Sequence, residues 1–161
     1  MSNLKTLATL GQAVWLDYIR RSFLLSGEMQ GLVDQGARGV TSNPAIFKQA
    51  IADSDDYDEE IARLAREGKG VEEIYETLAV EDIRMAADLL RPVYEQTGGE
   101  DGYVSLEVSP ALAHDTASTV DEARRLAALL DRPNVMIKVP ATPEGVAAIE
   151  HLSARGISVN A

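Results

Sequence analysis

Five short segments of the chain read as β-strands, because apolar and polar positions alternate along them with a period of two. They are residues 13–17, 39–43, 103–108, 135–140 and 157–161. The segments between them favour helices, since apolar residues recur there at helical spacing, most clearly over residues 71–94, 120–130 and 146–152. Strands that alternate with helices predict an α/β protein built from parallel βαβ units.

Capping signals predict where several helices begin and end. Ser26 is a plausible N-cap for a helix through Val33, and Thr119 and Glu122 form a capping box that should open another helix. Pro92 should kink or shorten the helix that contains it. Residues 4–10 read as a short helix or irregular lead-in, and residues 45–70 as an irregular helical region.

The predicted strands have one aliphatic face and one face with a polar residue near the carboxyl end. An open doubly wound sheet has helices on both faces, and its strands usually read as continuous apolar runs. A (β/α)₈ TIM barrel instead gathers polar residues from its strand ends at one rim. The inward residues expected at that rim are Asp17, Asn43, Glu107, Lys138 and Asn160, with Thr41 on the same face.

A barrel closes with eight strands, and these 161 residues supply five at most. We therefore expect residues 1–161 to be the N-terminal portion of a single barrel domain, truncated in the fifth strand. A part-barrel of this kind would expose two sheet edges, so self-association is a possible consequence.

Lys138 is the residue in these strands with the most evident chemistry. Loss of hydration favours the neutral amine of a lysine, which is the nucleophile that forms a Schiff base with a ketone. Alone, Lys138 is better explained as a strand-end lysine whose stem packs while its ammonium reaches water. The acids and amides expected at the ends of the neighbouring strands reverse that preference.

Composition excludes several other kinds of protein. The chain contains no cysteine, which rules out disulfides and thiolate chemistry, and its two histidines lie in unrelated segments. A formal net charge of -11 argues against nucleic acid and anionic membranes as partners. No apolar run is long enough to span a bilayer and no signal peptide is evident, so a cytoplasmic protein is expected.

Five motifs in a fixed order give the chain a specific resemblance. They are QAVWLD at 12–17, VTSNP at 40–44, VSLEVSP at 104–110, IKVPAT at 137–142 and GISVN at 156–160. With these motifs the sequence resembles the N-terminal half of the transaldolase family, over essentially its whole length. The resemblance implies a class I enzyme of the pentose phosphate pathway that needs no metal and no cofactor. It implies phosphorylated sugars as substrates, with dihydroxyacetone moved from sedoheptulose 7-phosphate to glyceraldehyde 3-phosphate.

The resemblance also implies a role for each residue that matches a family motif. Lys138 would form the Schiff base, Asp17 would take the proton from the C4 hydroxyl, and Glu107 would activate the water used in carbinolamine formation and hydrolysis. Asn43, Asn160 and Thr41 would bind substrate hydroxyls.

The family's catalytic threonine and phosphate-binding residues would lie beyond Ala161, so we expect little or no turnover from these residues alone. Three alternatives stay open on the sequence. The parent protein could join a transaldolase to a glucose-6-phosphate isomerase domain, or it could be another Schiff-base aldolase. The chain could also be a non-catalytic, self-associating half-barrel.

Overall fold

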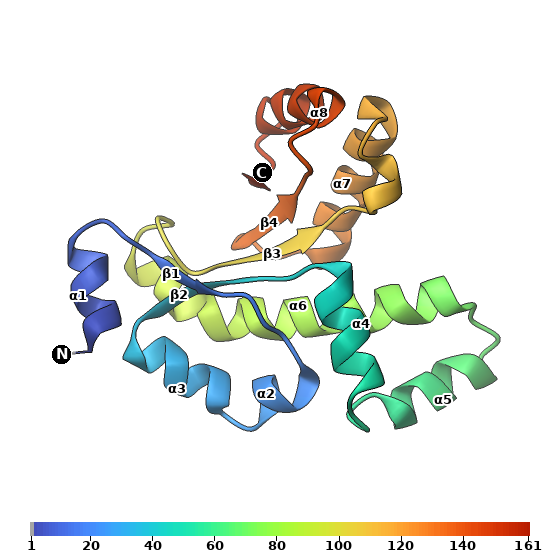
Figure 1. The fold of residues 1–161 in the computed structure, drawn as a ribbon, viewed down its shortest axis with the longest axis horizontal. Helices are drawn as coiled ribbons and strands as arrows, with labels where there is room; N and C mark the ends of the chain where they lie inside the picture. The colour runs from blue at the N-terminus through green and yellow to red at the C-terminus, as the bar shows by residue number, and fades with distance from the viewer. Residues whose placement is uncertain (1) are drawn as a thin grey trace.

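Five parallel strands form one sheet in the computed structural model, which describes residues 2–161. They are β1 (Val14–Leu16), β2 (Ala37–Thr41), β3 (Tyr103–Glu107), β4 (Val135–Lys138) and β5 (Val159–Asn160). Each strand pairs with the next one along the chain (Figure 1). A sequential parallel order is that of a barrel wall, whereas a doubly wound sheet reverses its order part-way. The predicted class is therefore confirmed: an α/β protein consistent with part of a TIM barrel.

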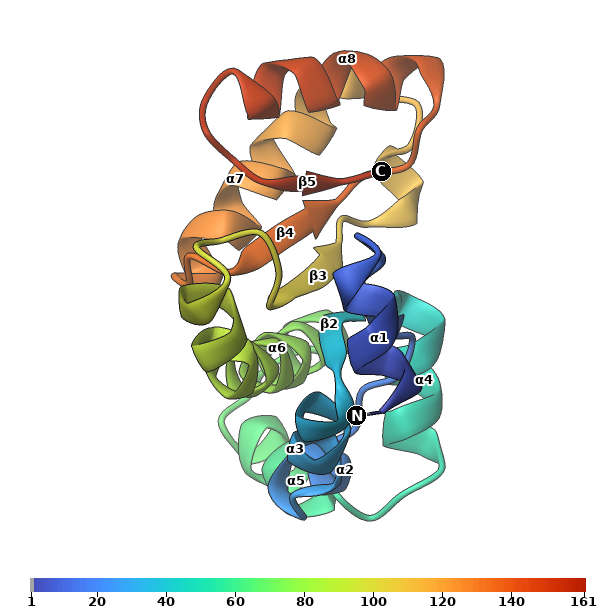
Figure 2. The same cartoon turned by 90° about the vertical axis from the view of Figure 1, so that its left-hand side faces the viewer.

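Helices connect the strands and pack along the sheet (Figures 1 and 2). They are α1 (Asn3–Thr9), α2 (Arg21–Leu25), α3 (Glu28–Gln35), α4 (Pro44–Ala52), α5 (Asp58–Arg66), α6 (Val71–Gln96), the 3-10 turn η1 (Pro110–Leu112), α7 (Thr116–Leu130) and α8 (Pro143–Ser153). Helix α6 contacts β2 and β3, α7 contacts β4, and α8 contacts β5. Within residues 2–161, no helix is both long and apolar enough to cross a membrane.

The aliphatic face of the sheet forms the main core with these helices, as the alternation predicts. Val104 and Ile137 on neighbouring strands are buried in one cluster with Ile83 and Leu90 of α6. Burying a side chain of this size stabilises the fold by about 1.5–3 kcal/mol. This packing fixes the strands in place and leaves their polar positions on the opposite face.

The opposite face of the sheet is concave. Trp15 of β1 lines the same hollow as Met136 of β4 and Val159 of β5, and this hollow has a volume of about 400 Å³. Residues from the first strand can meet residues from the last two only if the sheet curls. The concave face therefore corresponds to the interior of a barrel wall.

Gly39 is required where β2 passes beneath the Trp15 indole. The two residues are register partners, and a Cβ built on Gly39 would lie 2.3 Å from the Cδ2 atom of Trp15. We expect Gly39→Ala to lower the free energy of unfolding by about 2–3 kcal/mol, because the added methyl group would overlap the Trp15 ring and force the ring or the strand to shift. Urea denaturation followed by circular dichroism measures this.

Gly31 of α3 supplies the matched control for that substitution. A Cβ at Gly31 would meet nothing within 4 Å. Gly31→Ala should therefore raise stability by about 0.5–1 kcal/mol, through helix propensity alone. If Gly39→Ala also left stability unchanged or raised it, the close packing of Trp15 on β2 would be wrong.

Two of the predicted helix boundaries are wrong. Ser26 ends the short helix α2, and α3 starts after Gly27, whose φ of 88° places it in the left-handed region that favours glycine. Helix α7 begins at Thr116, because the Asp115 side chain accepts a 3.0 Å hydrogen bond from the Ser118 amide and caps the helix one turn earlier. Helix α6 continues past Pro92 to Gln96, so the proline does not shorten it.

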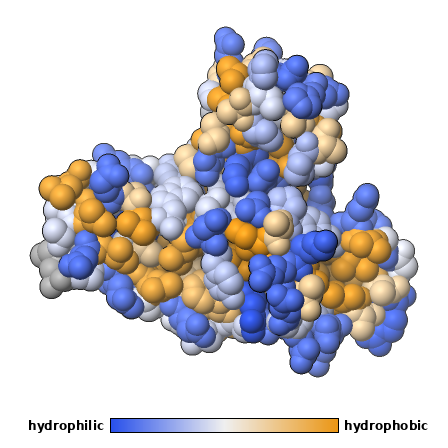
Figure 3. All heavy atoms as spheres, viewed as in Figure 1, coloured by the Kyte–Doolittle hydropathy of each residue, from blue (hydrophilic) through white to orange (hydrophobic). Residues whose placement is uncertain are grey.

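An apolar hollow of about 330 Å³ lies where α4, α5 and α6 meet. Its lining includes Ile51, Ile61, Val71 and Ile74. Figure 3 shows apolar side chains gathered at the end of the molecule where α5 and the start of α6 lie. Val71 is 83% exposed there.

Candidate active site

Lys138 and Glu107 meet at the carboxyl ends of two adjacent strands. They are register partners on β4 and β3, and Lys138 Nζ lies 3.1 Å from Glu107 Oε2. Their side chains are 29% and 16% exposed, so the pair is partly shielded but reachable from solvent. A primary amine beside a carboxylate has the groups needed for imine chemistry, a nucleophile and a proton carrier.

Asn160 stands on the other side of Lys138, as its register partner on β5. Its Nδ2 atom donates a 3.2 Å hydrogen bond to Ser105 Oγ, and Ser105 Oγ donates a 3.1 Å bond to Thr41 Oγ1. Ser105 is fully buried. Three polar side chains from β2, β3 and β5 are thus joined on the face that also presents Lys138.

Asn43 follows β2 and serves as the N-cap of α4. Its Oδ1 atom accepts a 2.9 Å hydrogen bond from the Ile46 amide, which satisfies one of the free N–H groups at the helix start. Pro44 occupies the first turn of that helix. The cap fixes the orientation of the Asn43 amide at the carboxyl end of β2.

Asp17 lies apart from the other predicted site residues. It follows β1, is exposed, and lines a hollow of about 290 Å³ with Arg20 and with Gln49 and Asp53 on and just after α4. Among residues 2–161, its carboxylate makes no hydrogen bond or ion pair with Lys138. The structure therefore joins Lys138 to Glu107, and Thr41 to Asn160 through Ser105, but it does not bring Asp17 into contact with them.

The loop that follows Asp17 is anchored by ion pairs. Arg20 Nε lies 2.8 Å from Asp56 Oδ2, and the same oxygen accepts a 3.0 Å bond from the Ser22 amide. Hydrogen bonds from Ser22 and Arg20 lower the pKa of Asp56 to about 2. Ile19, just before these anchors, is fully buried. The backbone that follows Asp17 is consequently held in place.

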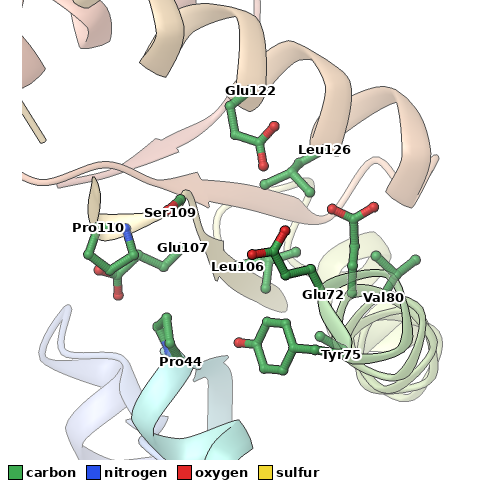
Figure 4. Close-up of a pocket in the computed structure, with 12 residues that line it drawn as sticks. Pro44, Glu72, Tyr75, Val80, Leu106, Glu107, Ser109, Pro110, Glu122 and Leu126 are labelled. Carbon is green, nitrogen blue, oxygen red and sulfur yellow. The ribbon is translucent and has the colours of Figure 1, made fainter. Parts of the chain in front are cut away.

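A cavity of about 380 Å³ opens next to Glu107 on the helix side of β3. Figure 4 shows Tyr75 of α6 pointing its hydroxyl into this cavity, toward the side where Pro44 and Glu107 lie. Burial raises the pKa of the Tyr75 hydroxyl, and the negative charge of Glu107 adds to the shift. The Glu107 carboxylate thus borders space large enough for water as well as the lysine.

Comparisons with known proteins show the family of the chain. The family model described as "Transaldolase/Fructose-6-phosphate aldolase" matches residues 14–161. The chain belongs to this family. It is 53% identical over 161 residues to a protein named transaldolase from Thiobacillus denitrificans, covering 99% of this chain and 45% of that relative. It is 55% identical over 160 residues to one from Thermobifida fusca, covering 99% of this chain and 44% of that relative. The chain spans less than half the length of these relatives.

Ser105 is the residue at this site to which the sequence interpretation gave no role. The signal was present, since Ser105 lies two positions before Glu107 and therefore on the same face of β3. What the sequence does not show is that its hydroxyl joins two other strands. In the described part of the chain, no three His, Cys, Asp or Glu side chains gather as they would around a metal ion.

Proposed function

We propose that this chain supplies the Schiff-base lysine and its proton-transfer partner to a transaldolase reaction. Lys138 Nζ would attack the ketone carbon of a ketose, and the carbonyl oxygen would leave as water once it has taken up protons. The observation that supports this most directly is the 3.1 Å contact between Lys138 and Glu107 at adjoining strand ends. Membership of the family supports it independently.

Glu107 is suited to manage the water in this step. Its carboxylate reaches the amine on one side and borders a cavity on the other, so a proton can pass between lysine, carboxylate and water. Glu107 would protonate the departing oxygen of the carbinolamine. In the reverse direction it would activate the water that hydrolyses the imine.

Asp17, Asn43, Asn160 and Thr41 are assigned to the rest of the substrate. Asp17 would take the proton from the C4 hydroxyl as the carbon–carbon bond breaks, and the protonated imine would accept the electron pair. Asn43, Asn160 and Thr41 would hold hydroxyls of the three-carbon unit that stays on the lysine. The substrates proposed for the whole enzyme are sedoheptulose 7-phosphate and glyceraldehyde 3-phosphate.

An aldolase without an acceptor sugar would use the same lysine chemistry. The description of the matched family covers both activities. The relatives named above are transaldolases, and this favours group transfer. The proposal for the whole enzyme therefore keeps transaldolase as the activity.

Trapping of the imine tests the proposal on this chain. With dihydroxyacetone and cyanoborohydride, hydride adds to the iminium carbon and leaves a stable secondary amine. We expect peptide mass mapping to find the adduct on Lys138 at least about tenfold faster than on Lys5, Lys48 or Lys69, because a positioned proton carrier accelerates imine formation. Labelling of Lys138 no faster than of those three lysines would refute the Schiff-base assignment.

A further inference from the structure

Ser105 joins the polar side chains that surround Lys138 but cannot itself reach a ligand. Its side chain is 0% exposed, and its hydroxyl makes two hydrogen bonds, to Thr41 Oγ1 at 3.1 Å and from Asn160 Nδ2 at 3.2 Å. A hydroxyl carries one proton. That proton is donated to Thr41, so Ser105 Oγ can only accept a hydrogen bond from Asn160. Asn160 must therefore donate through its NH₂ group.

This chain of hydrogen bonds determines which atoms face a bound ketone. Asn160 is the register partner of Lys138, and its Nδ2 atom bonds Ser105 on the strand at the other side of Lys138, so both side chains lie on the same face of the sheet. With Nδ2 committed to Ser105, Asn160 Oδ1 is left as an acceptor and makes no side-chain hydrogen bond within residues 2–161. Thr41 accepts from Ser105, so its own hydroxyl proton is available.

We propose that Ser105 is a positioning residue that orients Asn160 and Thr41 toward the hydroxyls of a ketone bound at Lys138. The proposal rests on the Schiff-base function and extends it to selectivity. A ketone with hydroxyls next to the carbonyl could donate to Asn160 Oδ1 and accept from Thr41 Oγ1. A ketone without hydroxyls would leave both groups unpaired, which is unfavourable in a partly shielded site.

A ratio of two rates separates this role from a merely structural one. The rates of cyanoborohydride trapping on Lys138 are measured with dihydroxyacetone and with acetone, and their ratio is the preference for hydroxyls. Loss of folded protein lowers both rates equally and leaves the ratio unchanged. Ser105→Ala should lower the ratio about fivefold, the effect of one weakened hydrogen bond of roughly 1 kcal/mol.

Ser42→Ala is the matched control. Ser42 is also fully buried, and its hydroxyl donates a 2.8 Å bond to the Ser105 carbonyl, outside the chain that reaches Asn160. The ratio of trapping rates in Ser42→Ala should equal that of the unchanged protein. Because Ser105 acts partly through Asn160, the double variant Ser105→Ala/Asn160→Ala should lower the ratio by less than the product of the two single effects.

Three outcomes would overturn the assignment of Ser105. The first is an unchanged ratio of trapping rates in Ser105→Ala. The second is a fall of this ratio in Ser42→Ala as large as that in Ser105→Ala. The third is a double variant in which the effects of Ser105→Ala and Asn160→Ala on the ratio multiply. Absence of preferential labelling of Lys138 with either ketone is a different result. It would refute the proposed Schiff-base function, and the role of Ser105 with it.

Discussion

Glu107→Gln is expected to slow imine formation on Lys138 about 100-fold. Glutamine has nearly the same size as glutamate and can still accept a hydrogen bond from the lysine, but it cannot take up and release a proton. Positioned general acids and bases contribute roughly 10²–10⁴-fold to such steps. The measurement is the time course of cyanoborohydride trapping with dihydroxyacetone, read by mass spectrometry of the peptide that contains Lys138.

Glu72→Gln makes the same change of charge without the same chemistry. Glu72 lines the cavity that also borders Glu107, but its side chain comes from the first turn of α6 (Figure 4). We expect this variant to trap the ketone at the unchanged rate. Equal slowing in both variants would show that Glu107 acts through the general negative potential of the cavity, and unchanged trapping in Glu107→Gln would remove it from the mechanism.

The strands and the polar residues at their ends could be predicted because both follow from local alternation. Glu107, Lys138 and Asn160 each fall on the polar face by counting residues along one strand. Parallel strands with the same register then bring these residues together at one edge. Alternation along each strand is therefore enough to place both members of the ion pair correctly.

The wrong helix boundaries arise where two local signals compete and tertiary packing decides. Asp115 and Thr119 can each cap a helix, but Thr119 is 1% exposed and its hydroxyl donates to the Leu112 carbonyl, which places it inside the first turns of α7. Pro92 weakens α6, yet Leu90 and Val93 on either side of it are buried in the core. Their burial offsets the hydrogen bond that proline removes.

Hydrogen bonds that join particular side chains of distant segments could not be predicted. Ser105 meets Thr41 and Asn160, which are 64 and 55 residues away, and no spacing rule links them. Asp82 is a stronger case. The pattern of apolar residues along α6 does not predict that this acid is buried. Asp82 is nevertheless completely buried, and it is hydrogen-bonded to Arg21 and Tyr57, which lie 61 and 25 positions away.

Asp82→Ala is expected to lower the free energy of unfolding by about 3–5 kcal/mol, because it leaves the charge of a half-buried arginine without its main partner. Asp82 Oδ1 accepts from Arg21 Nε at 2.6 Å, and Oδ2 accepts from the Tyr57 hydroxyl at 2.7 Å. The Tyr57 hydroxyl in turn accepts from the Arg21 amide at 2.9 Å. This network ties the start of α2, just after the Asp17 loop, to α6.

The exposed ion pair between Arg132 and Asp88, also on α6, provides the control. Their side chains are 31% and 57% exposed and lie 2.7 Å apart, so Asp88→Ala should cost about 1 kcal/mol or less. Urea denaturation of both variants compares the two pairs on one helix. If both variants lost the same free energy of unfolding, burial would not increase the contribution of the Asp82 network to stability.

Burial raises the pKa of the Asp82 carboxyl, although the Tyr57 hydroxyl and Arg21 act in the opposite direction. The raised pKa means that the free energy lost when the carboxylate is removed from water exceeds the free energy gained from its hydrogen bonds and its ion pair. Stability from this group is therefore fully present below the unfolded pKa of about 3.9 and is lost as the pH rises through the folded pKa.

It follows that Arg21→Met/Asp82→Leu, which removes both charges, should recover most of the stability lost in Asp82→Ala at neutral pH. A double variant as unstable as Asp82→Ala would contradict this. It would show that the ion pair itself stabilises the loop that presents Asp17, and that the loss in Asp82→Ala does not come from leaving Arg21 unpaired.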